Sequence, residues 1–273
     1  MEEMTNMVNM VIGAIYAVLI LDTMAVFIAV RTNFARGYKN NRMVFLCVCI
    51  LGWLLTDFAV LFVTNVSINS LLANIALSFV GFASAAGFLL VIKTTMPQRE
   101  LSKGFVISLL VLPTITTFIA FTSNYHSLLR NFDRLVPWPR DVEYTLGAWF
   151  PVHALYSFAL VLIGIYLMVK WTANESKENR GSGILVICAL VLLIVSNIVY
   201  GSGFMPIDID PTSIVATVLV LAFHLLFSDN KHKAVLNSLK SQIIIPAVGI
   251  VLITLIVFIT YAICQSGRYS SPN

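Results

Sequence analysis

The chain has 273 residues, of which 59% are hydrophobic and only 11% are charged, and its formal net charge is +4. An average globular protein carries about 25% charged residues, so this composition excludes an ordinary soluble fold. The small positive charge gives no reason to expect a nucleic acid as partner, and the partner that the composition predicts is the lipid bilayer.

The hydrophobic residues come in blocks that are long enough to cross a bilayer. A helix that rises ~1.5 Å per residue needs ~17–25 mostly apolar residues to do so. The alternating pattern of membrane barrel strands is absent. We therefore predict an all-α fold, a polytopic transmembrane helix bundle with about eight spans. These spans are Val8–Val30, Met43–Thr64, Ile68–Ile92, Phe105–Ser123, Trp149–Lys170, Ile184–Phe204, Thr212–Ser228 and Ile243–Cys264.

The connections between the spans differ in their basic residues. Four alternate connections hold 13 of the 17 Lys and Arg residues, beginning with Arg31–Arg42 and ending with Lys231–Lys240. The remaining connections and the ends hold only Arg130, Arg134, Arg140 and Arg268. Because cytoplasmic loops are enriched in Lys and Arg, this bias predicts that both termini lie outside the cell.

The first three spans contain the two acidic residues that lie inside a span, Asp22 and Asp57. Such a residue costs at least ~2.5–3.5 kcal/mol at the bilayer centre, which makes each of them a candidate functional group. Asp22 falls at about the depth of His224 in the seventh span, so we expect either a buried pair or separate hydrogen bonds. The third span carries small residues four apart, Gly81 and Ala85, which suit packing within the chain or a homodimer face.

Polar residues gather in the outer halves of several spans and at the end of the fourth. His153 and Tyr156, like Asn197 and Tyr200, are three residues apart and share a helix face. Such faces either bind a small molecule or hold the bundle together by hydrogen bonds between helices. If they bind a ligand, the outer segment Asn124–Gly147 would cover the site. The candidate ligand-binding residues are Asp57, Asn124, His126, His153, Tyr156, Asn197 and Tyr200.

Motifs for enzymatic chemistry are absent from the sequence. It has no phosphate-binding loop, no H-E-x-x-H, no G-x-S-x-G and no paired acidic metal motif. The four cysteines lie in predicted spans without a C-x-x-C spacing. We therefore expect no enzyme activity, no cofactor and no metal site.

Four phrases in the second half of the chain follow a known pattern. Thr122–Leu128 is similar to "T-N-x-x-H-x-L", and Gly147–Ser157 is similar to "G-x-x-F-x-x-H-x-x-Y-S". Ser196–Tyr200 fits "x-N-x-x-Y", and Ile209–Thr212 is similar to "D-x-T-P" with the last two residues exchanged. Together these phrases resemble the seven-span N-terminal sensor region of bacterial and archaeal histidine kinases, over about residues 105–238 and more loosely before that.

This resemblance implies a sensory module in the plasma membrane of a prokaryote. Residues 1–241 would form the seven-span sensory domain, and residues 242–273 an eighth transmembrane helix and the start of an extracytoplasmic segment. The eighth span departs from the family, in which a cytoplasmic helix usually leads to the kinase. A proline often seen in the sixth span of the family is also missing here.

We therefore expect a receptor that senses a small molecule outside the cell or within the membrane and passes the signal to an output outside this chain. The alternative is a small-solute transporter or a channel subunit. Transporters often contain internal repeats with matched breaks in their helices, and neither is visible here.

Overall fold

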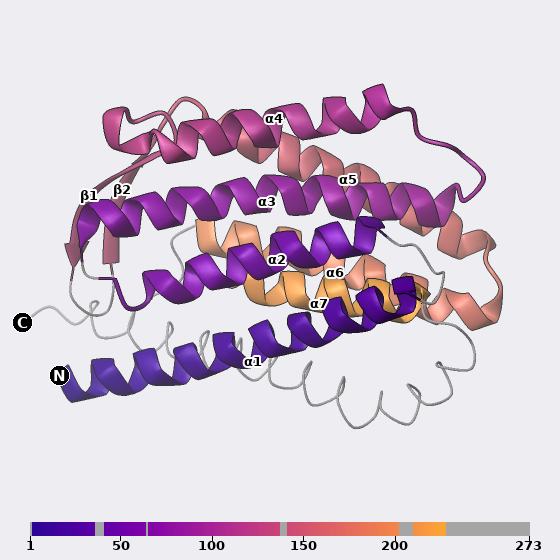
Figure 1. The fold of residues 1–273 in the computed structure, drawn as a ribbon, viewed down its shortest axis with the longest axis horizontal. Coiled ribbons are helices and arrows are strands. Elements are labelled where there is room, and N and C mark those ends of the chain that lie inside the picture. The colour runs from indigo at the N-terminus through magenta and orange to yellow at the C-terminus, as the bar shows by residue number, and fades with distance from the viewer. Residues whose placement is uncertain (1, 36–40, 64, 137–140, 202–209, 228–273) are drawn as a thin grey trace, which may run out of the picture.

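The computed structural model describes residues 2–35, 41–63, 65–136, 141–201 and 210–227. Within these residues the chain forms a bundle of α-helices with one short two-stranded sheet at one end (Figure 1). The elements in chain order are α1 (Glu2–Ala35), α2 (Asn41–Val60), α3 (Val66–Thr95), α4 (Lys103–Phe121), the 3-10 helix η1 (Ser123–Tyr125), β1 (Arg130–Val136), β2 (Asp141–Leu146), α5 (Phe150–Asn174), α6 (Lys177–Gly201) and α7 (Thr212–Phe227).

The predicted fold class is confirmed for the described part of the chain. Helices α1 to α6 are each long and apolar enough to cross a membrane, and α7 is a shorter apolar helix. The protein is thus an all-α, multi-pass membrane protein. The expected eighth span, Ile243–Cys264, and the domain boundary at residues 241/242 lie outside the described residues.

Side chains that bond to free backbone N–H groups fix where three of the helices begin. The Asn65 side chain accepts a hydrogen bond from the Ile68 N–H at 3.1 Å, and Ser102 accepts one from the Phe105 N–H at 3.2 Å. The Asp210 carboxylate accepts one from the Thr212 N–H at 2.9 Å, with Pro211 at the first turn of α7. Asn and Ser before a helix, and proline at its first position, are favoured for this reason. The cap at Asn65 starts α3 two residues before the predicted span.

Five helices form a closed ring. Contacts run from α2 to α3, from α3 to α5, from α5 to α6, from α6 to α7, and from α7 back to α2. Helix α1 packs outside this ring against α2 and α7, and α4 packs outside it, mainly against α3 (Figure 1). The ring therefore has an interior in which side chains from five helices can meet.

The small residues of α3 are used inside the bundle. A Cβ atom added at Gly81 would lie 3.3 Å from Cε1 of His153 and 3.4 Å from Cβ of Pro113, so α4 and α5 both approach α3 closely here. Ala85, one turn later, is completely buried. The small residues Gly81 and Ala85, which suited either packing within the chain or a homodimer face, thus form an internal packing face of α3. A homodimer stays a prediction, and it would have to use another surface.

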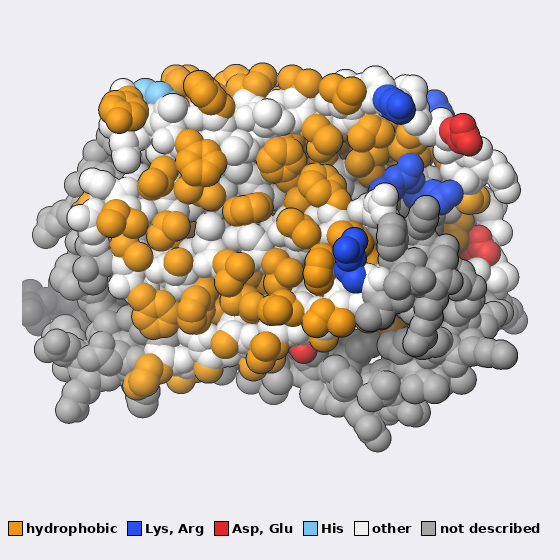
Figure 2. All heavy atoms as spheres, in the orientation of Figure 1, with side chains coloured by type: hydrophobic (Ala, Val, Ile, Leu, Met, Phe, Trp, Pro, Cys, Tyr) orange, Lys and Arg blue, Asp and Glu red, His pale blue; other side chains and the backbone are white. Residues whose placement is uncertain are grey.

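The outer surface of the helices is apolar, as lipid contact requires. Large hydrophobic side chains such as Phe118 and Leu155 are more than 70% exposed, and Figure 2 shows hydrophobic side chains spread over the face of the bundle. Cys188 of α6 is also exposed on this surface, unlike the buried Cys47 and Cys49. Lys and Arg side chains gather at one end of the visible face, opposite the end with the β-hairpin (Figures 1 and 2).

The segment Asn124–Gly147, which we expected as an outer loop, contains an antiparallel hairpin of β1 and β2. Arg130 pairs with Leu146 and Val136 with Asp141, with an irregularity in the register between Phe132 and Arg134. The alternation of polar and apolar residues in Asp141–Leu146 is the period of a half-buried strand. This alternating pattern is short compared with the long apolar blocks of the chain, and we did not predict a strand from it.

Candidate functional site

A cavity of about 320 Å³ lies inside the five-helix ring. This volume is at the lower end of the range of ~300–1,000 Å³ that small-molecule sites occupy. Its wall includes residues of all five ring helices, Tyr16 of α1, and Arg130 and Leu146 of the hairpin. None of its described lining residues belongs to α4.

The cavity is elongated along the helix axes. Its lining residues on α5 run from Phe150 to Gly164, which at ~1.5 Å per residue is about 21 Å. A round cavity of the observed volume would be only about 8–9 Å across, shorter than this run of helix. The cavity is therefore long and narrow.

The wall of the cavity changes from polar to apolar in the same direction on all five helices. The polar end lies beside the hairpin and contains Asp57 on α2, Asn69 on α3, His153 on α5, Asn197 on α6 and Thr212 on α7. The opposite end is lined by aliphatic and small residues of the same helices: Leu46 and Ile50, Gly87 and Val91, Val161 and Gly164, Leu190, and Leu219. Ser84 is a polar residue further in, and its hydroxyl already donates to the Val80 carbonyl at 2.9 Å.

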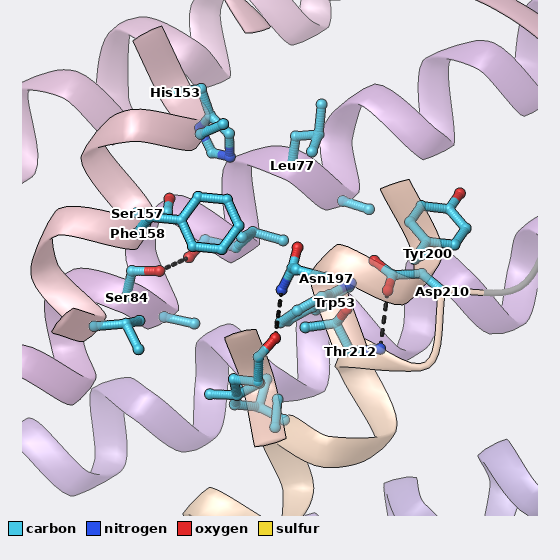
Figure 3. A pocket seen from close by; sticks show the side chains of 18 of the residues that line it. Trp53, Leu77, Ser84, His153, Ser157, Phe158, Asn197, Tyr200, Asp210 and Thr212 are labelled. Carbon is cyan, nitrogen blue, oxygen red and sulfur yellow. Dashed lines mark hydrogen bonds between the residues drawn. The ribbon is translucent and has the colours of Figure 1, made fainter. Parts of the chain in front are cut away.

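Three uncharged polar side chains of the wall have buried atoms without a hydrogen-bond partner. They are both ring nitrogens of His153, the hydroxyl of Ser157 one turn later on α5, and the hydroxyl of Thr212 on α7. His153 is only 2% exposed and Thr212 only 1%. Figure 3 shows His153 and Ser157 on α5 on one side of the pocket, and Asn197 and Thr212 on the other. Since more than 90% of buried polar groups in proteins are hydrogen-bonded, such a group of exceptions marks a place that can receive a ligand.

The polar end of the cavity is joined to the first turn of α7. The buried hydroxyl of Tyr16 lies 3.3 Å from the Ser213 hydroxyl and 3.5 Å from Oδ2 of Asp57. It also lies 3.5 Å from the carbonyl oxygen of Asp210, whose carboxylate caps α7. Helices α1, α2 and α7 thus meet in one buried hydrogen-bonded cluster, hereafter the Tyr16 cluster.

The hairpin is fixed to α3 at the same end. The Arg130 guanidinium donates to the Ala73 carbonyl at 2.5 Å, and the Asn74 amide donates to the Arg130 carbonyl at 3.3 Å. Arg130 is only 9% exposed, so its charge lies inside the protein at the end of the cavity. The base of the hairpin therefore forms part of the wall.

Four of the seven predicted ligand-binding residues lie on the cavity wall: Asp57, His153, Asn197 and Tyr200. They come from three helices, as the idea of a convergent site requires. The structure leaves their role as ligand contacts a prediction, and it supplies the shared space that this role needs.

The other three predicted residues lie away from the cavity. The Tyr156 hydroxyl donates to the Leu109 carbonyl of α4, outside the ring. His126 bonds locally, with its Nε2 2.9 Å from the Thr122 hydroxyl and its Nδ1 accepting from the Leu128 N–H at 3.3 Å. Asn124 is exposed in η1. None of these three residues lines the cavity, and the described wall receives residues from α3 but none from α4.

Several residues of the wall were missed by the sequence analysis. Ser157 and Thr212 belong to the phrases that carry the family resemblance, and they could have been noticed there. Tyr16 in the first half of α1 and Asn69 in the first turn of α3 are polar residues within their helices and gave the same kind of signal as Asn197. Arg130 was placed in a loop, and only the hairpin brings it to the cavity.

The geometry of the bundle agrees with a comparison against known protein families. The family model described as the N-terminal 7TM region of histidine kinase matches residues 14–231 of the chain. The chain belongs to this family. It is thus a membrane sensor module of the histidine-kinase type, and the suspected resemblance is confirmed. A comparison with curated proteins finds no match.

The sequence also predicted a polar pair inside the membrane, Asp22 and His224. Asp22 is half-buried on α1 and His224 is half-buried on α7, and these two helices pack against each other. A direct pairing of Asp22 with His224 remains a prediction. Within the described residues no group of three His, Cys, Asp or Glu side chains could hold a metal ion.

Proposed function

We propose that the chain is the non-catalytic receptor part of a two-component sensor in the plasma membrane of a prokaryote. It takes a small amphipathic molecule into the cavity and passes the event to an output that is not part of the seven-span region. Membership in the histidine-kinase sensor family favours this reading over a transporter or a channel subunit.

The observation that carries the proposal is the lack of hydrogen-bond partners at the ring of His153. Its ring is buried in the wall of the cavity, and neither nitrogen has a hydrogen-bond partner. Leaving a buried polar group unpaired costs roughly 1–3 kcal/mol, which a ligand bonding to this ring would recover. Ser157 and Thr212 offer two further unpaired groups at the same end.

We infer the orientation in the membrane from the distribution of charge. The hairpin and the start of α1 lie at one end of the bundle, and exposed Lys93, Lys103 and Lys170 lie near the ends of α3, α4 and α5 at the other end (Figure 1). The enrichment of basic residues in cytoplasmic loops supports an outer position for the hairpin end. The polar end of the cavity would then face outward.

The Tyr16 cluster offers a route from the cavity to α7. A ligand at Thr212 would contact the first turn of this helix, next to Ser213 and Asp210, which bond to Tyr16. Binding transmits a signal only if it favours one packing of the helices over another. Helix α7 is the element that we expect to move, because it runs from the polar end of the cavity to the basic end of the bundle.

The test compares His153→Phe with a matched control in lipid nanodiscs. Phenylalanine keeps an aromatic ring and removes both nitrogens. Tyr156→Phe removes a hydroxyl from the same helix whose partner lies outside the cavity. The probes are medium-chain alkyl compounds with three different heads: a carboxylate, a primary amine and a vicinal diol.

We expect at least one of the three to raise the unfolding temperature of the natural protein. Its affinity should fall by roughly 5- to 150-fold in His153→Phe, which corresponds to the loss of one or two buried hydrogen bonds. Tyr156→Phe should bind as the natural protein does. Absence of binding by all three probes, or equal binding by His153→Phe, would show that the cavity is not a receptor site.

A further inference from the structure

The shape and polarity of the cavity restrict what it can bind. This inference rests on the proposed function, because it names the chemistry of the ligand for the same site. The wall is polar at the hairpin end and apolar at the other end on all five ring helices. A molecule that satisfies both ends must have a polar head and an apolar tail.

The width of the cavity restricts the tail. A volume of about 320 Å³ spread along roughly four turns of α5 leaves space for one extended chain. Two glycines on neighbouring helices, Gly87 on α3 and Gly164 on α5, line the apolar end of the cavity. A Cβ atom at Gly164 would lie 3.7 Å from Val91 and 4.0 Å from Leu190, and one at Gly87 would lie 3.9 Å from Leu219. All three neighbours are themselves lining residues.

The partners of the polar groups restrict the head. The two carboxylates of the wall already have partners, since Asp57 lies 3.5 Å from the Tyr16 hydroxyl and Asp210 accepts from the Thr212 N–H. The unpaired atoms of the uncharged side chains of the wall are the hydroxyls of Ser157 and Thr212 and the nitrogens of His153. Hydroxyl groups both donate and accept, and a neutral imidazole has one nitrogen of each kind.

Desolvation opposes a charged head. The described wall contains the carboxyl groups of Asp57 and Asp210 and one guanidinium, that of Arg130, which already donates to the Ala73 carbonyl. A carboxylate or an ammonium group of a ligand would have to leave water for a medium of low dielectric constant, which costs free energy unless the group is paired there. A hydroxylated head adds no charge, and it offers to His153, Ser157 and Thr212 the donors and acceptors that they lack.

We propose that the ligand is an uncharged, hydroxylated amphiphile with one unbranched alkyl chain. Its head lies among His153, Ser157 and Thr212, and its chain lies along α3, α5 and α6, with Gly87 and Gly164 setting the longest chain that fits.

The first arm of the test varies the head at constant chain length. The vicinal diol should bind the natural protein at least about tenfold more tightly than the carboxylate or the amine. Free concentrations are corrected for the partition of each compound into empty nanodiscs. A carboxylate or an amine that binds more tightly than the diol, with the same dependence on His153, would overturn the proposed head while leaving the proposed function intact.

The second arm varies the chain length of the diol. Burial of one more methylene should raise the affinity about three- to fourfold until the chain fills the cavity, after which the gain ends. In Gly164→Leu the gain should end at a shorter chain, while the shortest diols bind as before. Gly181→Leu is the matched control, because a Cβ at this exposed glycine meets nothing within 4 Å.

If Gly164→Leu does not fold, Gly87→Val shortens the same end from α3. A limiting chain length that is the same in the natural protein and in a folded variant would contradict the proposed position of the chain. If no head at any chain length binds, the proposed function itself fails, which is a different result from a wrong head.

Discussion

Tyr16 joins three helices through one hydroxyl group. Its ring is 1% exposed, and its oxygen lies within 3.3–3.5 Å of Ser213, Asp57 and the Asp210 carbonyl. These distances are long for O–H···O hydrogen bonds, whose usual length is ~2.7–2.8 Å. The hydroxyl therefore stabilises the start of α7 only modestly.

We expect Tyr16→Phe to lower the free energy of unfolding by about 0.5–1 kcal/mol, the net value of one interhelical hydrogen bond in a membrane. Ser213→Ala should cost a similar amount. The double variant should cost less than the sum, since both changes remove the same contact. The measurement is reversible unfolding in bicelles. Strictly additive losses would show that Tyr16 and Ser213 do not act together.

At the scale of residues, helical spacing predicted part of the site. His153 and Tyr156 are three residues apart and were expected to share a face, but three steps of ~100° leave them roughly 60° apart around the axis. That angle is enough for His153 to line the cavity while Tyr156 bonds to α4. Ser157, four residues after His153, lies only about 40° away and lines the cavity with it.

At the scale of elements, the spans were predictable because their hydrophobicity depends only on local sequence. The described helices α1 to α7 all overlap predicted spans, and the differences are at the ends, where caps such as Asn65 and Ser102 decide. Which helices surround the cavity was not predictable. That depends on which helix faces pack together: α4 and α5 both approach α3 at Gly81, but only α5 also packs against α6 and closes the ring.

The hairpin, unlike the spans, could not be predicted from the local sequence. Its strands are short, and its base is attached to α3 by hydrogen bonds between Arg130 and residues Ala73 and Asn74, which no local pattern records. The expectation that this segment would cover the site placed it at the right end of the bundle. The structure adds that the base of the hairpin, with Arg130 and Leu146, is part of the wall.

For the whole molecule, the proposed orientation can be tested with two exposed residues. Ser127 follows η1 at the hairpin end, and Lys170 lies near the end of α5 at the opposite end. Each is replaced by cysteine in a background without native cysteines. A membrane-impermeant maleimide should label Ser127→Cys in intact cells and Lys170→Cys only after lysis. Labelling of both variants in intact cells, or of Lys170→Cys alone, would overturn the outer position of the hairpin.

A ligand that fills the cavity should change the position of α7. The most direct measurement is the distance between nitroxide labels at Lys93→Cys on α3 and Phe227→Cys at the end of α7, both exposed at the basic end. The control pair, Lys93→Cys and Lys103→Cys, joins α3 to α4, which is not part of the wall. Helix shifts in switching proteins are ~1–2 Å, so a change of this size is expected in the first pair.

We predict that the medium-chain vicinal diol shifts the α3–α7 distance, leaves the α3–α4 distance unchanged, and has no effect on the first pair when His153→Phe is present. An α3–α7 distance that stays the same, while the diol measurably stabilises the protein through His153, would contradict it.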